Sequence, residues 1–255
     1  METLLARLPD SGAFIGIMLA ALLGGLSRGF SGFGAALVFV PLASAAVGPR
    51  AAVPVLALLE CVSCLAFLPN AWRHAQRREV AVMAAGAVCA VPFGALILAY
   101  GDPVALRWGL TGLVLLAVAV LASGLRYRGQ GAAPLTFGVG ALGGVMSGTA
   151  MLGGVPPATW WLGRNAPAVI VRANMNLYFA ILTAAVTAAY AWRGLIGWDS
   201  AWLALAAGPA YALALWGGTR LFGLASERTF RRAGYALILA AAVLGMPLWD
   251  PLTGR

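Results

Sequence analysis

The sequence predicts an all-α polytopic membrane protein, and three observations lead to this fold class. Apolar side chains make up 62% of the 255 residues and charged ones only 10%, whereas soluble domains carry roughly 25% charged residues. The charges leave long uncharged runs, comparable to the roughly 20 apolar residues that a helix needs to cross the hydrocarbon core. These runs lack the alternation of a membrane β-barrel. We therefore expect one integral membrane domain over residues 1–255.

The first element is expected to be a helical hairpin over residues 11–48. Its opening run at 11–27 is interpreted as a retained helix, because Glu2 and Asp10 stand before it and no convincing signal-peptide cleavage site follows. The remaining runs predict three helices, a second hairpin and three closing helices, near residues 51–71, 80–100, 107–124, 132–163, 167–191, 200–218 and 233–249.

Arginines gather in three predicted loops, which are Arg73–Arg77–Arg78, Arg126–Arg128 and Arg228–Arg231–Arg232. By the positive-inside rule these loops face the cytoplasm. Alternating the elements outward from them predicts that the N- and C-termini are external. The net charge of +9 therefore indicates membrane topology, so the expected partner is the lipid bilayer and not a nucleic acid.

The two halves of the chain show a repeat at an offset of 116 residues. Pairs at this offset are Gly24 and Gly140, Ser31 and Ser147, Gly32 and Gly148, and Pro41 and Pro157. We therefore expect a first repeat over 11–125 and a second over 132–249. Each contains a glycine-broken hairpin and three transmembrane helices. Five elements in each half are an odd number, so the repeats would have inverted topology, a recurring plan of secondary transporters.

Both hairpins carry dense glycines, in the segments 24–34 and 140–154. Glycines at this density predict a broken helix, and a serine beside the break is a candidate cap for the next half-helix. The free N–H groups and the positive dipole end of a half-helix attract anions. The alternative is that Gly25-x-x-x-Gly29 and Gly144-x-x-x-Gly148 are close-packing helix faces.

The two glycine hairpins, the basic loop after the third element and the stretch Val171–Phe179 (VRANMNLYF) together resemble the TauE/SafE family of bacterial membrane transporters, which includes sulfite exporters. The resemblance covers about residues 12–249. It implies a multi-pass protein of the bacterial plasma (inner) membrane that carries sulfite, organosulfonates or similar small anions. One departure is visible: Gly144 stands at the position that matches Arg28, so the two half-sites differ chemically.

Three charges interrupt otherwise apolar spans, and charges there are costly enough to suggest a function. Arg28 and Arg172 are expected to neutralise an oxyanion. Glu60 is the candidate proton carrier, since desolvation favours the neutral form of a carboxyl group. The alternative is structural: Glu60 and Arg172 pair or share one polar cavity, and Arg28 snorkels to the interface. The full predicted substrate site is Arg28, Ser31, Gly32, Ser147, Gly148, Thr149, Arg172, Asn174 and Asn176.

Enzymatic readings fit the sequence poorly. Gly29-Phe30-Ser31-Gly32 resembles the serine motif of rhomboid proteases, which needs a histidine base on a neighbouring helix. The only histidine, His74, falls in the Arg73–Arg78 loop. We therefore expect no enzyme, no cofactor and no metal site, and we interpret Cys61-x-x-Cys64 as buried packing residues.

The sequence thus predicts a secondary transporter that moves a small anion by alternating access. Coupling to a proton and assembly into a homo-oligomer stay open. The alternative function is a non-transporting membrane scaffold or assembly subunit whose glycine faces bind other helices.

Overall fold

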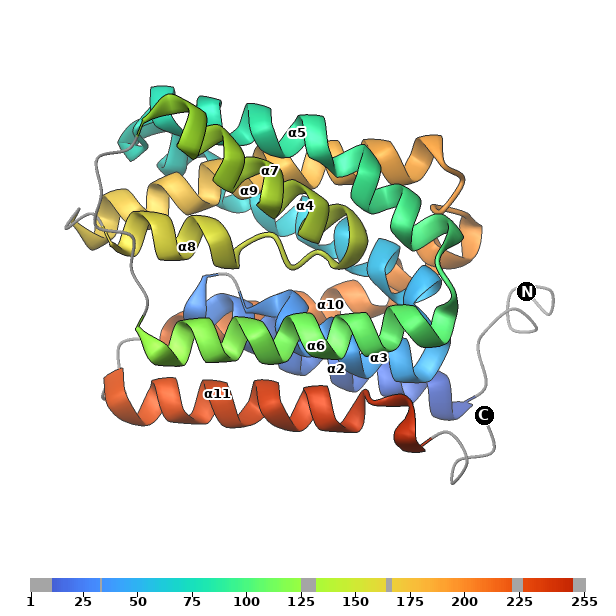
Figure 1. Cartoon of the computed structure of the whole chain (residues 1–255). Coiled ribbons are helices and arrows are strands. Elements are labelled where there is room, and N and C mark those ends of the chain that lie inside the picture. Colours follow the sequence, from blue (N-terminus) through green and yellow to red (C-terminus); the bar gives the residue numbers. More distant parts are fainter. Residues whose placement is uncertain (1–10, 33, 125–131, 164–166, 222–226, 250–255) are drawn as a thin grey trace. The chain divides into compact units, whose positions relative to one another are not determined.

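A computed structural model describes residues 11–32, 34–124, 132–163, 167–221 and 227–249 of the chain. Every regular element among these residues is a helix (Figure 1), as expected for an all-α membrane protein. The elements are α2 (Ser11–Ser31), α3 (Ala35–Val47), α4 (Pro49–His74), α5 (Arg77–Tyr100), α6 (Pro103–Ser123), α7 (Ala133–Ala150), α8 (Val155–Leu162), α9 (Ala168–Trp192), α10 (Trp198–Leu221), α11 (Glu227–Leu244) and the short 3-10 helix η1 (Pro247–Trp249).

The predicted elements are present, and two basic segments differ from prediction. Helix α4 continues to His74 and α5 begins at Arg77, so most of the predicted Arg73–Arg78 loop is helical. The last predicted helix, 233–249, is α11, which begins at Glu227 and ends at Leu244. Arg228, Arg231 and Arg232 therefore belong to a helix, because arginine is a good helix former and extends a helix beyond its apolar part. The Arg126–Arg128 cluster lies outside the described residues.

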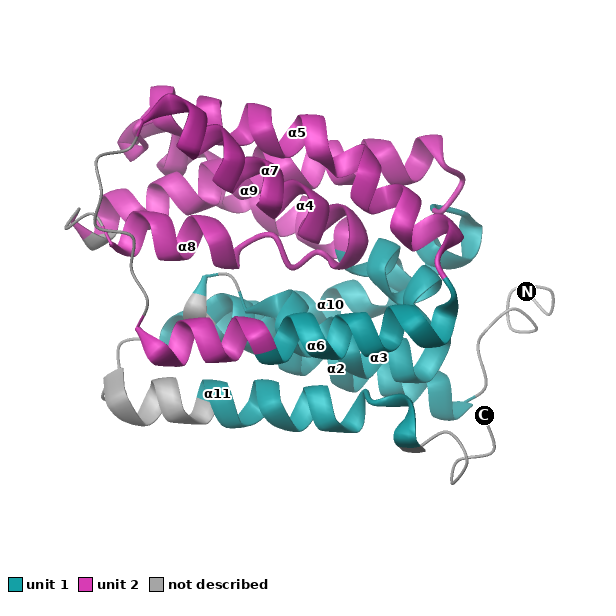
Figure 2. Cartoon of the chain, viewed as in Figure 1, with its two compact units in different colours: residues 1–56, 102–115, 196–255 teal, residues 57–101, 116–195 magenta. Residues whose placement is uncertain are grey.

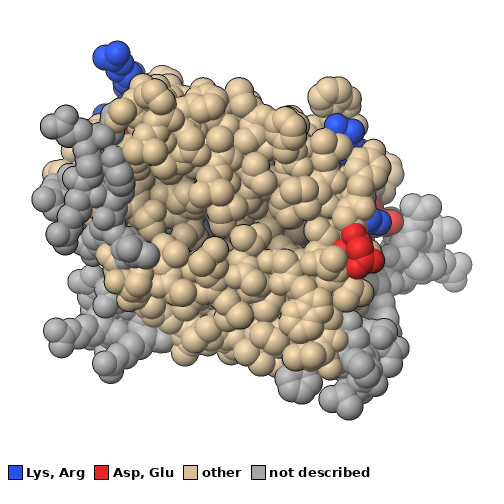
Figure 3. All heavy atoms as spheres, in the orientation of Figure 1, with Lys and Arg blue, Asp and Glu red and all other residues tan. Residues whose placement is uncertain are grey.

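Within the part of the chain that the structure describes, six helices are long and apolar enough to cross a membrane: α2, α4, α5, α6, α9 and α10. The hairpin helix α3 and the described apolar part of α11 are shorter. On the face drawn in Figure 3, the charged side chains gather near the helix ends, and uncharged side chains cover the broad band between them. A band without charge suits lipid tails, and the chain is a multi-pass membrane protein.

The helices divide into two compact units, coloured separately in Figure 2. Unit 1 contains residues 1–56, 102–115 and 196–255, and unit 2 contains residues 57–101 and 116–195. Helices α4 and α6 pass from one unit to the other within their lengths. Each unit combines helices from the first and the second half of the chain.

In unit 1, α2 and α3 form the first predicted hairpin, and α10 packs along α2. A Cβ added to Gly25 would overlap the carbonyl oxygen of Tyr211, and one added to Gly29 would overlap that of Leu215. Contacts that advance in the same direction on both helices show that α2 and α10 run parallel. Their backbones approach this closely only because these positions are glycine.

In unit 2, α7 packs along α5 in the same parallel manner. Added Cβ atoms at Gly140, Gly144 and Gly148 would overlap the carbonyl oxygens of Met83, Ala87 and Val91, respectively. The close-packing interpretation of Gly25-x-x-x-Gly29 and Gly144-x-x-x-Gly148 is therefore confirmed. These glycines do not break their helices, which continue through them.

Candidate functional site

The first hairpin breaks at Gly32, which has the left-handed backbone angle φ +82. Arg28, one turn earlier on α2, is only 3% exposed. Its Nη1 donates to the carbonyl oxygen of Gly32, and the N–H of Gly32 donates to the carbonyl oxygen of Arg28 at 2.8 Å. Two predicted site residues, Arg28 and Gly32, therefore lie together at the break. The side chain of the third, Ser31, lies outside the described side chains.

The second hairpin breaks between α7 and α8, over residues 151–154. Met151 adopts a left-handed conformation with φ 59. The Oγ atom of Ser147 accepts a hydrogen bond from the N–H of Gly153 at 3.1 Å. The predicted serine cap is wrong for this hairpin, because α8 begins at an N-cap Gly154 without a side-chain cap. Ser147 lies in the last turn of α7, and its hydroxyl closes the connection instead. The predicted Ser31 cap of the first hairpin lies outside the described side chains.

Helix α9 holds the end of α7 in place. The hydroxyl of Tyr190 donates to the carbonyl oxygens of Ser147 at 3.2 Å and of Gly148 at 2.7 Å. The hydroxyl of Thr149 donates to the carbonyl oxygen of Val145 at 2.9 Å and lies 3.3 Å from that of Gly94. One short segment thus contains three predicted binding residues of unit 2: Ser147, Gly148 and Thr149. Their polar groups form hydrogen bonds that stabilise the hairpin.

The start of α8 has few backbone donors for an anion. Its first three residues are Val155, Pro156 and Pro157, and proline has no N–H group. The N–H of Ala158 already donates to the carbonyl oxygen of Gly154 at 3.1 Å. The expectation of a half-helix N-terminus rich in free N–H groups is therefore wrong for this hairpin. The adjacent prolines in the sequence were the signal that could have shown it.

Two buried side chains that are not among the predicted site residues lie beside this break. Trp161 on α8 is 2% exposed and Tyr178 on α9 is 0% exposed. Their rings meet edge to face, with centroids 6.0 Å apart. A Cβ added to Gly143 would meet both the Tyr178 hydroxyl and the carbonyl oxygen of Gly153, which places that hydroxyl at the broken end of the hairpin.

Neither polar group of this pair has a hydrogen-bond partner among the described residues: the indole Nε1 of Trp161 and the hydroxyl of Tyr178. Buried polar groups of proteins are overwhelmingly hydrogen-bonded, so each exception calls for an explanation. Tyr178 belongs to the stretch Val171–Phe179, but nothing in that stretch marks it as a binding residue. Each of the two residues is buried and has a hydrogen-bond donor without a partner among the described residues. This combination arises only where α8 packs on α9.

Helices α4 and α9 run antiparallel in unit 2, as three side-chain contacts show. Sγ of Cys61 lies 3.2 Å from Oγ1 of Thr187, and Sγ of Cys64 lies 3.9 Å from Oγ1 of Thr183. Further along, Oδ1 of Asn174 accepts the backbone N–H of Gln76 at 2.7 Å. Both cysteines are free thiols, Cys64 buried and Cys61 partly so, which agrees with a packing role.

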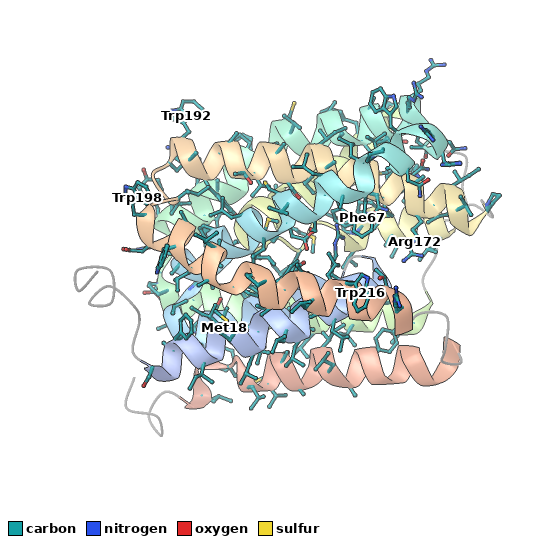
Figure 4. All side chains as sticks on the ribbon, turned by 180° about the vertical axis from the view of Figure 1, so that it is seen from behind. Met18, Phe67, Arg172, Trp192, Trp198 and Trp216 are labelled. Atoms are coloured by element: carbon teal, nitrogen blue, oxygen red, sulfur yellow. The ribbon has the colours of Figure 1, made fainter. Side chains whose placement is uncertain are left out.

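This register contradicts the predicted pairing of Glu60 with Arg172. Glu60 is level with the Thr187 region of α9, about 15 residues after Arg172, or roughly 22 Å at a rise of about 1.5 Å per residue. Figure 4 shows Arg172 near the start of α9, at the end opposite Trp192. Glu60 is 5% exposed, whereas Arg172 is exposed. The predicted pairing is wrong because antiparallel helices place residues that match at the offset of 116 at opposite depths.

Asn174 and Asn176 lie near Arg172 at the start of α9. Asn174 is completely buried, and its Nδ2 also donates to Oε1 of Gln76 at 3.2 Å. Nearby, the indole N–H of Trp160 donates to Oε1 of Glu79 at 2.8 Å. The turn between α4 and α5 is thereby attached to both α8 and α9. Asn176 is half-buried.

The described residues contain no group of three or more His, Cys, Asp or Glu side chains that could hold a metal ion. Comparison with protein families matches residues 17–245 to the family described as "Sulfite exporter TauE/SafE". No curated protein and no solved structure matches the chain.

Proposed function

Because this chain belongs to the sulfite exporter TauE/SafE family, we propose that it is a secondary transporter of small anions in the bacterial plasma membrane, working by alternating access. The observation that carries the proposal is the burial of Arg28 beside the broken first hairpin. An arginine charge inside an apolar helical unit is costly and is kept for a function. Sulfite and organosulfonates are the candidate substrates.

The chemistry around Arg28 favours an oxyanion. A guanidinium group has five N–H donors in a planar fork, which matches the oxygens of sulfite, sulfonate or carboxylate. The contact with the Gly32 carbonyl orients the group toward the break. Helix α3 begins three residues later, and its positive dipole end adds to the attraction. Gly32 and Ser31 complete this half-site in the proposal.

The second half-site, in unit 2, has no arginine at its break. Ser147, Gly148 and Thr149 position the connection there, and Asn174 and Asn176 stand near Arg172 at the start of α9. We assign Arg172 the task of attracting anions to this end of unit 2, since it is exposed. Long-range attraction of this kind raises the rate of capture rather than the strength of binding.

Glu60 is the proposed carrier of a coupling proton. It is the one buried acidic side chain among the described residues. Buried carboxyl groups within membrane spans are typical members of the proton relays of transporters. Glu60→Gln should retain anion exchange and lose the pH change inside proteoliposomes that accompanies transport, with Glu79→Gln as the control. An E60Q variant that still acidifies or alkalises the lumen would remove Glu60 from coupling.

Repeats of inverted topology, 11–125 and 132–249, are part of the proposal. Supporting it, the first helix of each half packs in parallel on the fourth helix of the other, α2 on α10 and α7 on α5. Exchange of the halves would convert one pair into the other. The antiparallel α4 and α9, and the basic residues at the adjoining ends of α4 and α5, agree with external N- and C-termini.

The alternative function, a scaffold whose glycine faces bind other proteins, is less favoured. The faces of Gly25, Gly29, Gly144 and Gly148 are already covered by helices of their own units. Flux measurements separate the two functions. We expect proteoliposomes to take up labelled sulfite or a sulfonate saturably, and Arg28→Ala to abolish uptake while the exposed Arg50→Ala retains it. A wild-type protein inactive across a broad anion panel would contradict transport.

A further inference from the structure

The second hairpin contains two buried donors with no acceptor among the described residues, the Trp161 indole N–H and the Tyr178 hydroxyl. From these we infer an anion subsite of neutral donors in unit 2, where Trp161 and Tyr178 bind the oxygens of a sulfur oxyanion. This inference rests on the proposed function and adds to it the residues and the ligand chemistry of the second half-site.

The chemistry of the donors selects the class of ligand. An indole N–H only donates, so its partner must present an acceptor. A cation such as an alkylammonium has none, whereas each oxygen of sulfite or a sulfonate carries lone pairs. The subsite therefore takes an oxyanion and holds it with hydrogen bonds to a charged acceptor, which are stronger than those between neutral groups.

The position of the pair supports the same assignment. The Tyr178 hydroxyl lies beside Gly143 and the Gly153 carbonyl, where the hairpin breaks. Pro156 and Pro157 remove backbone donors from the start of α8. The side chains thus supply at this break the donors that the backbone lacks. The residues at the matching positions of the first half, Ala45 and Val62, cannot donate, so the subsite belongs to the second hairpin.

Residues of the same type on the same two helices provide matched controls. The Tyr190 hydroxyl already donates to the carbonyl oxygens of Ser147 and Gly148, and the Trp160 indole already donates to Glu79. Removing these hydroxyl and indole donors breaks structural hydrogen bonds. Removing the donors of Tyr178 and Trp161 breaks no hydrogen bond with a described residue. The control variants should therefore lose stability and keep their anion affinity, whereas the Tyr178 and Trp161 variants should lose anion affinity.

The experiment titrates sulfite and methanesulfonate into the purified full-length protein by calorimetry and follows thermal unfolding without ligand. Tyr178→Phe and Trp161→Phe should each weaken anion binding about tenfold, as expected for one hydrogen bond to a charged ligand. Tyr178→Phe should leave the unfolding temperature unchanged or higher, and Trp161→Phe should lower it less than Trp160→Phe does, because both tryptophan variants lose ring volume but only Trp160→Phe also breaks a hydrogen bond. Tyr190→Phe and Trp160→Phe should lower the unfolding temperature and keep the affinity within about twofold of wild type.

Two outcomes would overturn the subsite. One is a Tyr178→Phe or Trp161→Phe variant with wild-type affinity; the other is an equal loss of affinity in the control variants. If the pair only holds a structural water, its variants lose stability and keep affinity, which is the first of these outcomes. Failure of the proposed function looks different, because the wild-type protein itself then binds neither anion.

Discussion

Asn174 accepts the backbone N–H of Gln76 with Oδ1 at 2.7 Å and donates to its side-chain oxygen from Nδ2 at 3.2 Å. One buried asparagine thus satisfies both polar atoms of its amide on a single residue 98 positions earlier in the chain. This double contact attaches the turn between α4 and α5 to α9. It makes Asn174 a structural residue of unit 2 as well as a neighbour of Arg172.

Asn174→Ala should destabilise the protein by about 1–3 kcal/mol, because the backbone N–H of Gln76 loses its acceptor. Gln76→Ala should cost less, since that backbone hydrogen bond survives. Thermal or denaturant unfolding in detergent measures both, with the exposed Asn70→Ala as the control, expected within about 0.5 kcal/mol of wild type. A stable Asn174→Ala variant would refute the attachment.

Gly144→Ala should lower stability by about 1–3 kcal/mol by overpacking α7 against α5. The added Cβ would overlap the backbone of Ala87, which cannot give way as a side chain can. On the same helix, Gly138 has open space around it. Gly138→Ala should therefore be neutral or stabilising by about 0.5–1 kcal/mol, since alanine favours a helix. Equal effects of the two substitutions on the unfolding free energy would contradict the close packing.

Glu60 and Arg172 should act independently. Glu60→Gln and Arg172→Ala are expected to change the unfolding free energy additively, within about 0.3–0.5 kcal/mol, as is usual for sites more than about 10 Å apart without shared partners. A double-mutant cycle measures the interaction. A coupling energy well above this range would restore the ion pair that the α4–α9 register excludes.

Arg172→Ala should raise the KM for the anion and leave kcat nearly unchanged, if Arg172 attracts substrate from solution. The effect should shrink as ionic strength rises, because salt screens exposed charges. Arg193→Ala, at the opposite end of α9, is the matched control for loss of a positive charge. A salt-independent loss of kcat would instead place Arg172 in a binding site.

Local patterns in the sequence were enough to predict the helices. An uncharged run such as 80–100 must satisfy its own backbone hydrogen bonds in lipid, so its length and composition specify a helix, observed as α5. The breaks of both hairpins fall within the predicted glycine segments, at Gly32 and over residues 151–154. The basic ends were less predictable, because arginine suits a loop and a helix end equally well.

Site residues were predictable only as separate positions. Arg28 and Glu60 stand out in the sequence because a charge within an apolar span is rare, and both are buried in the structure. The sequence alone could not show which of these residues lie close together in space. Equivalence at an offset of 116 says nothing about depth in the membrane, whereas the antiparallel contacts of Cys61 and Gln76 with α9 separate Glu60 from Arg172.

The sequence by itself determined that this chain is a multi-pass helical membrane protein, because hydropathy is a local property, and its match to the sulfite exporter family over residues 17–245 determined the transporter family. Only the tertiary structure decided that Gly144 packs against a backbone, that Ser147 closes a connection, and that Trp161 and Tyr178 hold donors without a partner among the described residues. These facts depend on which helices pack together and in which register, and a side chain's burial and partners follow from that packing.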